Sequence, residues 1–358
     1  MKRIGIISLF GYNNYGNRLQ LYAVQQVYKR LGLLPEIIRY QEETPKEPLK
    51  IRLKILFYRM LHLRKSVSES YLKGKRERVF KKHAKAHYSE TIEYLNPHRI
   101  DRHFHERYSY FSVGSDQIWG WFSHGIASFM FLKFAPKEKR ITFSPSFGSS
   151  SISDNYREIF TKGLMGFPFI SVRETSGAEI VKKFTNRDAT VLCDPTMLLS
   201  KEEWQKFAAR HKNKPPQRFV LTYFLGEIPL QVSAILTGLS EDFEIINLNS
   251  LHFPKYYAVT PSEWVDYVNS ASLFLTDSFH GVVFSIVMQT PFAVYSRVGG
   301  ASMETRITNV LQKFDLDDRF GIPSYDPSLL SMDFTKTEEI IENEKAKAYA
   351  FLKKSLKL

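Results

Sequence analysis

The chain has 358 residues, of which 43% are hydrophobic and 24% are charged, and its net charge is +13. This length exceeds one ordinary hydrophobic core, so we expect two domains, and the composition excludes a disordered protein. The single cysteine, Cys193, excludes an intramolecular disulfide framework and a cysteine-rich metal site. No apolar run reaches the roughly 18 residues of a membrane span, and residues 1–10 are predicted to form a strand instead of a signal peptide, so we expect a cytoplasmic protein.

Predicted strands and helices alternate along the chain. In a first domain, residues 1–200, a strand, a Gly/Asn loop, a helix and a second strand occupy residues 2–10, 11–18, 19–31 and 36–40. Further strands are predicted at residues 108–113, 139–143, 169–172 and 191–193. In a second domain, residues 201–335, strands are predicted at 219–223, 244–247 and 273–275 and helices at 230–239, 262–269 and 279–288. A last helix over 338–356, in the segment 336–358, is expected to pack across both. The alternation predicts two doubly wound parallel sheets facing a cleft.

Residues 46–86 form a basic insertion in the first domain. The segment holds fourteen Lys and Arg residues against three Glu, a net charge of +11, which is nearly the whole excess of the chain. One interpretation is a helical hairpin whose apolar stripe packs on its own domain. A second is docking on an anionic membrane surface or a lipid-linked substrate. Nucleic acid is the weakest interpretation because no nucleic-acid motif accompanies the charge, so no nucleic-acid partner is expected.

The loop after the first strand, residues 11–18, has the G-x4-G spacing of a phosphate loop. It lacks the Lys and Ser/Thr that hold phosphate and Mg²⁺, so it is not a Walker site. Its glycines either permit a tight strand-to-helix turn or let the loop approach a ligand closely. The second alternative makes Asn14, Gly16 and Asn17 candidate substrate-binding residues.

Polar residues also follow two later strands. Ser115, Asp116 and Gln117 suit hydrogen bonding to a sugar or orientation of a catalytic partner, and N-capping by Ser115 or Asp116 is the structural alternative. Arg173 follows the apolar strand at 169–172, where a guanidinium group is a fork-shaped receptor for carboxylate or phosphate. An ion pair with Glu174 is the alternative role for Arg173.

The segment 276–281, Thr-Asp-Ser-Phe-His-Gly, lies between a predicted buried strand and a predicted buried helix. It directs unpaired backbone N–H groups and the imidazole of His280 at one point, where an anionic substrate fits. The positive end of the helix disfavours the protonated imidazole and so favours a neutral base, unless a bound dianion restores the proton.

Several of these motifs together resemble the polysaccharide pyruvyl transferases, which move the enolpyruvyl unit of phosphoenolpyruvate onto a pair of sugar hydroxyls to give a pyruvate ketal. The likeness is carried by NYGNRLQLYAVQ at 14–25, VGSDQIW at 113–119, ISVRE with its following Gly at 170–177, and TDSFHG at 276–281. DPTMLL at 194–199 and SFG at 146–148 support it. Together these segments span most of the chain.

The resemblance implies a GT-B-like pair of Rossmann-type domains with phosphoenolpyruvate as donor between them, and a transfer that needs neither a metal nor a cofactor. Arg173 matches the substrate-binding arginine of the family, and His280 matches its essential histidine, which we expect to be the general acid/base. Ser278 and Phe279 stand where many members carry Arg-Leu. The missing positive charge is then supplied by Arg306 or Arg297, or the donor differs.

The expected function is therefore transfer of a pyruvyl group to a sugar of a capsule or exopolysaccharide, or of its lipid-linked precursor. Ser278, Phe279 and Arg306 are then further substrate-binding residues, and Asp116 is a second catalytic residue that orients the acceptor or a catalytic side chain. The expected partners are phosphoenolpyruvate, a glycan or lipid-linked oligosaccharide, and the inner face of an anionic membrane. Two alternatives are a GT-B-type nucleotide-sugar glycosyltransferase and a non-enzymatic glycan- or membrane-binding protein.

Overall fold

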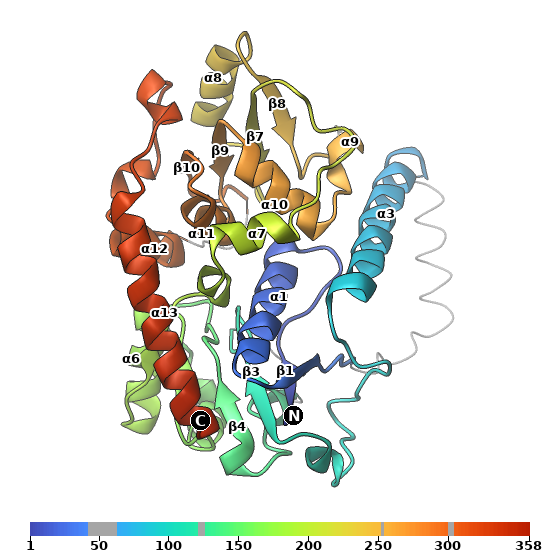
Figure 1. Ribbon diagram of the computed structural model, residues 1–358, viewed down its shortest axis with the longest axis vertical. Helices are drawn as coiled ribbons and strands as arrows, with labels where there is room; N and C mark the ends of the chain where they lie inside the picture. Colours follow the sequence, from blue (N-terminus) through green and yellow to red (C-terminus); the bar gives the residue numbers. More distant parts are fainter. Residues whose placement is uncertain (42–62, 121–125, 252–253, 300–303) are drawn as a thin grey trace.

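Two four-stranded parallel sheets, each flanked by helices, form the body of the protein (Figure 1). The computed structural model describes residues 1–358 except 42–62, 121–125, 252–253 and 300–303. The α/β class and the GT-B-like pair of parallel sheets are as predicted. Within the described residues, no helix combines the length and the hydropathy needed to cross a membrane.

The N-terminal half is built on a sheet of order β2-β1-β3-β4. Its strands, all parallel, are β1 (Arg3–Ile7), β2 (Leu34–Ile37), β3 (Tyr110–Val113) and β4 (Arg140–Thr142). A two-stranded sheet of β5 (Ser171–Val172) and β6 (Thr190–Val191) lies beside β4. Side chains join the two sheets, since the Ser171 amide donates to Thr142 Oγ1 (2.6 Å) and the Ser171 hydroxyl to the Thr142 carbonyl (3.0 Å).

The C-terminal half repeats the same winding in the order β10-β9-β7-β8. Its parallel strands are β7 (Phe219–Tyr223), β8 (Glu244–Asn247), β9 (Leu273–Thr276) and β10 (Phe292–Val294). Both sheets reverse their winding direction between their first and third strands, β1 and β3 in one half and β7 and β9 in the other. Open α/β sheets bind ligands at this reversal, beyond the carboxyl ends of the strands.

The helices of the described residues connect and cover these strands. They are α1 (Tyr15–Arg30), α3 (Leu63–His87), α4 (Ala127–Met130), α5 (Arg157–Leu164), α6 (Thr175–Thr185), α7 (Lys201–Phe207), α8 (Leu230–Leu239), α9 (Pro254–Tyr257), α10 (Pro261–Ser270), α11 (Phe279–Met288), α12 (Glu304–Phe314) and α13 (Thr335–Leu356). Every residue of α11 is buried, which explains its unbroken apolar sequence. The strand β10 and the helices α5, α7 and α12 were not predicted from the sequence.

One hydrophobic cluster spans both halves, and each half also has a cluster of its own. Tyr15 of α1 stacks on Trp264 of α10 with ring centroids 5.7 Å apart, and its hydroxyl donates to the Val259 carbonyl (3.2 Å). In Figure 1, α13 runs along both halves. The Leu356 carbonyl at its end accepts from the Tyr110 hydroxyl (2.8 Å) of the first sheet. This packing fixes the carboxyl ends of the two sheets relative to each other.

The basic insertion lies only partly within the described residues. Residues 46–62 are outside them, and the rest belongs to α3, a single helix. Its buried Arg76 donates to the carbonyls of Leu248 (2.8 Å) and Tyr257 (2.8 Å), which belong to the C-terminal half. Phe80 packs on Tyr15 of the N-terminal half at 4.9 Å. The helix therefore packs on both halves, whereas the hairpin interpretation expected contact with its own domain alone.

Candidate functional site

The site forms where the carboxyl ends of strands from both sheets meet. After β1, the first turn of α1 lies against the first turn of α11, which follows β9. The loops that follow β3, β5 and β6 add Asp116, Arg173 and Asp194, and α12 adds Arg306. The candidate residues predicted from separate segments are thus brought together.

The contact between Gly16 and His280 joins the two halves. A Cβ atom on Gly16 would lie 2.2 Å from His280 Nδ1 and 2.6 Å from its Cγ, far inside the distance of any real contact. Glycine is therefore the residue that lets the imidazole lie against α1. The helix begins at Asn14, whose side chain accepts from the Asn17 amide (3.2 Å) as its N-cap. Asn14 and Gly16 thus shape the wall behind the histidine.

Asp116 lies between two arginines. Its Oδ1 is 3.6 Å from Nη2 of Arg173 and 3.9 Å from Nη1 of Arg306. Its Oδ2 accepts a hydrogen bond from the side-chain amide of Asn17. The backbone of Asp116 has φ of +59°, which turns the carboxylate at the end of β3 toward these partners. The Asp116 carboxylate thus lies between two guanidinium groups. A position between two guanidinium groups also suits the carboxylate or phosphate of a ligand.

Arg173 is buried and its donors are largely used inside the protein. Nε donates to Glu174 Oε1 (2.8 Å) and Nη1 to Asp194 Oδ2 (3.0 Å). Burial would lower the pKa of Arg173, but Glu174, Asp116 and Asp194 hold it above its ordinary value. Nη2 has no hydrogen-bond partner among the described residues. The ion pair with Glu174 is present, and Nη2 is the group left for a ligand.

Arg306 and Phe279 complete this cationic side of the site. The Phe279 ring centroid lies 4.4 Å from Cζ of Arg173 and 5.5 Å from Cζ of Arg306. Burial and the neighbouring Arg173 lower the pKa of Arg306 to about 10. The side-chain oxygen of Gln117, in the amide orientation that satisfies both groups, accepts from Arg306 Nη2 at 3.0 Å.

Arg297 has a different role from Arg306. Its Nε donates to Asp277 Oδ2 (3.1 Å), and the same carboxylate accepts from the amides of Leu225 (2.7 Å) and Gly226 (2.8 Å). Asp277 is fully buried. Arg297 and Asp277 therefore fix the loop after β7, and Arg306 is the cation that stands beside Arg173.

The two candidate serines are held by the protein itself. Ser278 is the N-cap of α11, where its hydroxyl accepts from the Gly281 amide (3.3 Å) and its own amide donates to Thr276 Oγ1 (3.0 Å). Its hydroxyl oxygen and its amide thus serve the helix start, while the hydroxyl hydrogen takes no part in these two bonds. Ser115 is fixed by its backbone, whose carbonyl accepts from the Ser8 hydroxyl (3.0 Å) and whose amide donates to Gln20 Oε1 (3.3 Å).

Asp194 was not among the residues predicted for the site. Its Oδ2 faces both Arg173 and His280 Nε2, the latter at 3.6 Å. Burial would raise the pKa of Asp194, but His280 and Arg173 hold it below its ordinary value. The sequence feature that could have identified Asp194 as a site residue is Asp-Pro-Thr directly after a predicted strand. The same position predicts a helix cap, which Asp194 also provides to Thr196.

Two pockets adjoin the arginines. A small one of about 60 Å³ is lined by Arg173, Asp194, Phe279 and Arg306, among others. A second, of about 160 Å³, is lined by Gly148, Ser149, Ser150, Glu174, Ser176, Thr305 and Arg306. Hydroxyl groups dominate the second pocket. No group of His, Cys, Asp and Glu side chains that could hold a metal ion occurs in the part of the chain that the structure describes.

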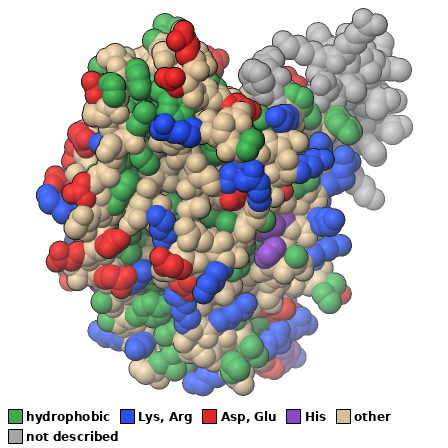
Figure 2. Space-filling model, turned by 45° about the horizontal axis from the view of Figure 1, so that its top comes forward, with side chains coloured by type: hydrophobic (Ala, Val, Ile, Leu, Met, Phe, Trp, Pro, Cys, Tyr) green, Lys and Arg blue, Asp and Glu red, His purple; other side chains and the backbone are tan. Residues whose placement is uncertain are grey.

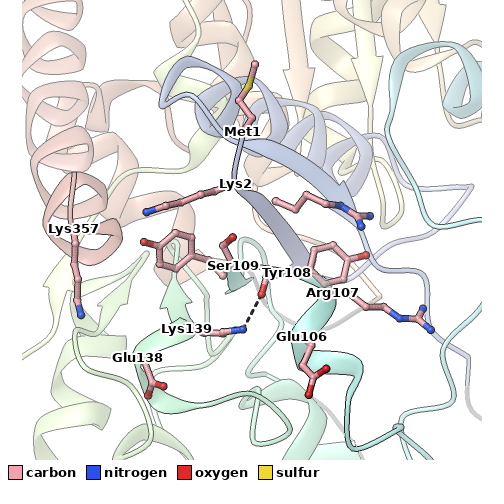
Figure 3. Close-up of a pocket in the computed structure, with 11 residues that line it drawn as sticks. Met1, Lys2, Glu106, Arg107, Tyr108, Ser109, Glu138, Lys139 and Lys357 are labelled. Atoms are coloured by element: carbon pink, nitrogen blue, oxygen red, sulfur yellow. Dashed lines mark hydrogen bonds between the residues drawn. The ribbon is translucent and has the colours of Figure 1, made fainter.

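A further pocket lies at the opposite ends of the strands. Figure 3 shows this space of about 610 Å³ with Lys2, Arg107, Lys139 and Lys357 around it. Lys139 donates to the Tyr108 carbonyl (3.0 Å), so its ammonium group is engaged. The pocket adjoins the amino ends of β1 and β3 and therefore does not belong to the site at their carboxyl ends.

Comparison with solved structures finds distant likenesses along the whole chain. S. aureus MnaA in complex with UDP has a TM-score of 0.47 at 9% identity, with 97% of this chain and 91% of that chain covered. UDP-GlcNAc 2-epimerase from Neisseria meningitidis bound to UDP-GlcNAc has a TM-score of 0.44 at 8% identity, covering 99% and 100%. Anabaena Alr3699/HepE with UDP and glucose has a TM-score of 0.43 at 11% identity, covering 98% and 95%.

No curated protein has significant sequence similarity to the chain. The model of one family, polysaccharide pyruvyl transferase, matches residues 14–297. The match begins at the N-cap of α1 and ends after β10, so it includes most of the site. The chain belongs to the polysaccharide pyruvyl transferase family.

Proposed function

We propose that the protein transfers a pyruvyl group from phosphoenolpyruvate to two hydroxyls of a glycan, with release of phosphate and formation of a pyruvate ketal. The observation that carries the proposal is the meeting of Arg173, Arg306 and His280, from both halves, at the carboxyl ends of the strands. Two cations and one proton carrier are the groups that an anionic enol phosphate needs for this chemistry.

The donor would bind between the two arginines. Phosphoenolpyruvate carries a carboxylate and a phosphate. Nη2 of Arg173 and the guanidinium of Arg306 can together bind either the carboxylate or the phosphate. Asp116 Oδ1 stands between these groups. Its other oxygen already accepts from Asn17, so a turn of the carboxylate toward Asn17 makes room for the donor. Arg306 thereby supplies the charge that Ser278 lacks.

The reaction balances with His280 as the proton carrier. Its imidazolium gives a proton to C3 of phosphoenolpyruvate, which turns the methylene into a methyl group and leaves oxocarbenium character at C2. One sugar hydroxyl adds to C2 and returns its proton to His280. Phosphate then leaves C2, and the second hydroxyl adds there while its proton leaves with the phosphate. One donor and one diol thus yield one ketal and one hydrogen phosphate.

The acceptor would enter beside Arg306. The pocket of about 160 Å³ opens there, and its hydroxyls on Ser149, Ser150, Ser176 and Thr305 suit hydrogen bonds to a sugar. The acceptor proposed is a sugar of a surface polysaccharide or of its lipid-linked precursor. Asp116 lies close enough to Arg306 to orient either the acceptor or the donor.

The experiment uses purified protein with phosphoenolpyruvate and candidate glycans. Replacing His280 by alanine is expected to lower phosphate release and ketal formation by about 10²–10⁴-fold, the usual contribution of a general acid/base. His98→Gln, at an exposed histidine, is the matched control and is expected to retain full activity. Unchanged phosphate release in His280→Ala contradicts the proposal. So does thermal stabilisation by a nucleotide sugar but not by phosphoenolpyruvate.

We also propose that the exposed face of α3 contacts an anionic membrane surface. Six exposed basic residues lie along this helix: Lys73, Lys75, Arg78, Lys81, Lys82 and Lys85. In Figure 2, Lys and Arg side chains gather along the right-hand edge of the molecule, the side on which Figure 1 draws α3. Such a face gains about 1 kcal/mol per basic residue near an anionic surface.

Co-sedimentation with vesicles tests this contact. Binding to vesicles that contain phosphatidylglycerol is expected at low salt and to fall as salt rises. Neutral vesicles serve as the control and should not bind. Reversing three charges, Lys81→Glu, Lys82→Glu and Lys85→Glu, is expected to abolish the binding while leaving phosphate release intact. Equal binding of this variant and the unmodified protein would exclude α3 as the contact surface.

A further inference from the structure

We infer that Asp194 is a positioning residue that keeps a proton on Nε2 of His280, so that protons pass to and from the donor through Nδ1. The inference rests on the reaction proposed above, in which His280 carries the proton. It adds a residue from the other half of the protein and assigns a separate role to each ring nitrogen.

The Asp194 carboxylate is held in one orientation. It follows β6 and caps the short helix Pro195–Leu198, where Oδ1 accepts from the Thr196 amide (3.0 Å) and hydroxyl (2.7 Å). Its side chain is 0% exposed. With Oδ1 committed to Thr196, Oδ2 is the oxygen that faces Nη1 of Arg173 at 3.0 Å and Nε2 of His280 at 3.6 Å. The carboxylate thus links the arginine and the histidine of the site.

The His280 ring is equally confined. Its Nδ1 is the ring atom nearest Gly16, and the Phe279 ring stands perpendicular to the imidazole at 5.2 Å between centroids. Nε2 is buried and makes no hydrogen bond of ordinary length within the described part of the chain, while the side chain as a whole is 11% exposed. The exposed part of the ring therefore excludes Nε2. Nε2 is thus closed to a ligand, and Nδ1, which lies beside Gly16, is the ring nitrogen that remains for a proton exchanged with the donor.

Electrostatics assign the resident proton to Nε2. A carboxylate that faces a ring nitrogen accepts from N–H and cannot donate to it, so it favours the tautomer or cation with hydrogen at that atom.

The other charged groups around this pair act through Arg173. Glu174 accepts from Nε of Arg173, and Asp116 faces its Nη2. Arg306 adds positive charge beyond Asp116. From α12 and α13, Lys313 and Glu344 form their own ion pair at 3.0 Å. Asp194 is thus the carboxylate at ion-pair distance from His280, which makes Glu174 a matched comparison: it binds the same arginine without facing the histidine.

Nitrogen-15 NMR of the histidine side chains tests the inference without substrate, with the His280 signal assigned by its loss in His280→Gln. In the unmodified protein at high pH, we expect the neutral ring to show the Nε2–H tautomer. In Asp194→Asn, this preference is expected to be lost, because an amide can donate to a ring nitrogen as well as accept from it. Glu174→Gln should keep the Nε2–H tautomer.

The results separate this inference from the proposed reaction. An Nδ1–H tautomer in the unmodified protein overturns the inference even if Asp194→Asn fails to fold. An equal change of tautomer in Asp194→Asn and Glu174→Gln, or no change in either, overturns it as well. In phosphate-release assays, Asp194→Asn should lower the turnover number, whereas Glu174→Gln should change only the donor concentration needed. If the proposed function is wrong, His280→Ala would show full phosphate release. This outcome does not depend on which tautomer the NMR spectrum shows.

Discussion

Replacing Gly16 by alanine is expected to lower phosphate release from phosphoenolpyruvate about 10²–10⁴-fold, as much as removing the general acid/base itself. The added methyl group would lie 2.2 Å from His280 Nδ1 and 2.7 Å from Cε1, so the ring has to leave its place. Phe279 and Asp194 lie on other sides of the ring, so this displacement also changes its distance from Asp194. The measurement is turnover of the folded variant, with Tm recorded in parallel.

Gly74→Ala is the matched control for this change. Gly74 also lies within a helix, α3, but a Cβ there meets no atom within 4 Å. Alanine at an open helical position stabilises by about 1 kcal/mol relative to glycine and should leave turnover unchanged. If Gly16→Ala retains normal turnover, His280 is not the proton carrier or does not need its observed position. A loss of turnover explained by unfolding would instead appear as a large fall in Tm.

The sequence predicted most of the strands, their winding and most residues at the strand ends, because these follow from local patterns. The long-range pairings of the same residues could not be predicted in this way. Gly16 reads locally as a turn glycine, yet it is needed because a histidine from the other sheet lies against it. Asp194 reads locally as a helix cap, which is correct for Oδ1. The use of Oδ2 depends on Arg173 and His280, which reach it only in the folded protein.

The cationic side of the site could likewise be predicted only in part from the sequence. The absence of an arginine at position 278 indicated that another cation was needed, and the sequence offered Arg306 or Arg297, of which Arg306 was predicted to bind the substrate. Only the fold separates them, because Arg297 is bound to Asp277 while Arg306 lies beside Asp116. The helix that carries Arg306, α12, was not predicted from the sequence.

Arg76→Ala is expected to have the largest effect on stability, a fall in the free energy of unfolding of about 3 kcal/mol or more. Arg76 donates to the carbonyls of Leu248 and Tyr257 at 2.8 Å each and to Asn249 Oδ1 at 3.0 Å, and its guanidinium lies 3.9 Å from the Tyr257 ring centroid. Hydrogen bonds to a charged group contribute about 1.5–3 kcal/mol each, and alanine leaves the buried carbonyls without a donor. Denaturant unfolding measures the loss.

Arg78→Ala provides the control because Arg78 is exposed on the same helix, and its loss should change stability by less than about 0.5 kcal/mol. Arg76→Lys separates charge from geometry, since one ammonium group cannot reproduce a planar fork that reaches three acceptors, and an intermediate loss is expected. Equal stability of Arg76→Ala and Arg78→Ala would mean that α3 does not hold the halves together. Arg76 belongs to the basic segment 46–86, which suggested contact with a membrane surface, yet its side chain is buried between α3 and the C-terminal half. The presence of a basic residue in a basic segment therefore does not establish that the residue faces an anionic partner.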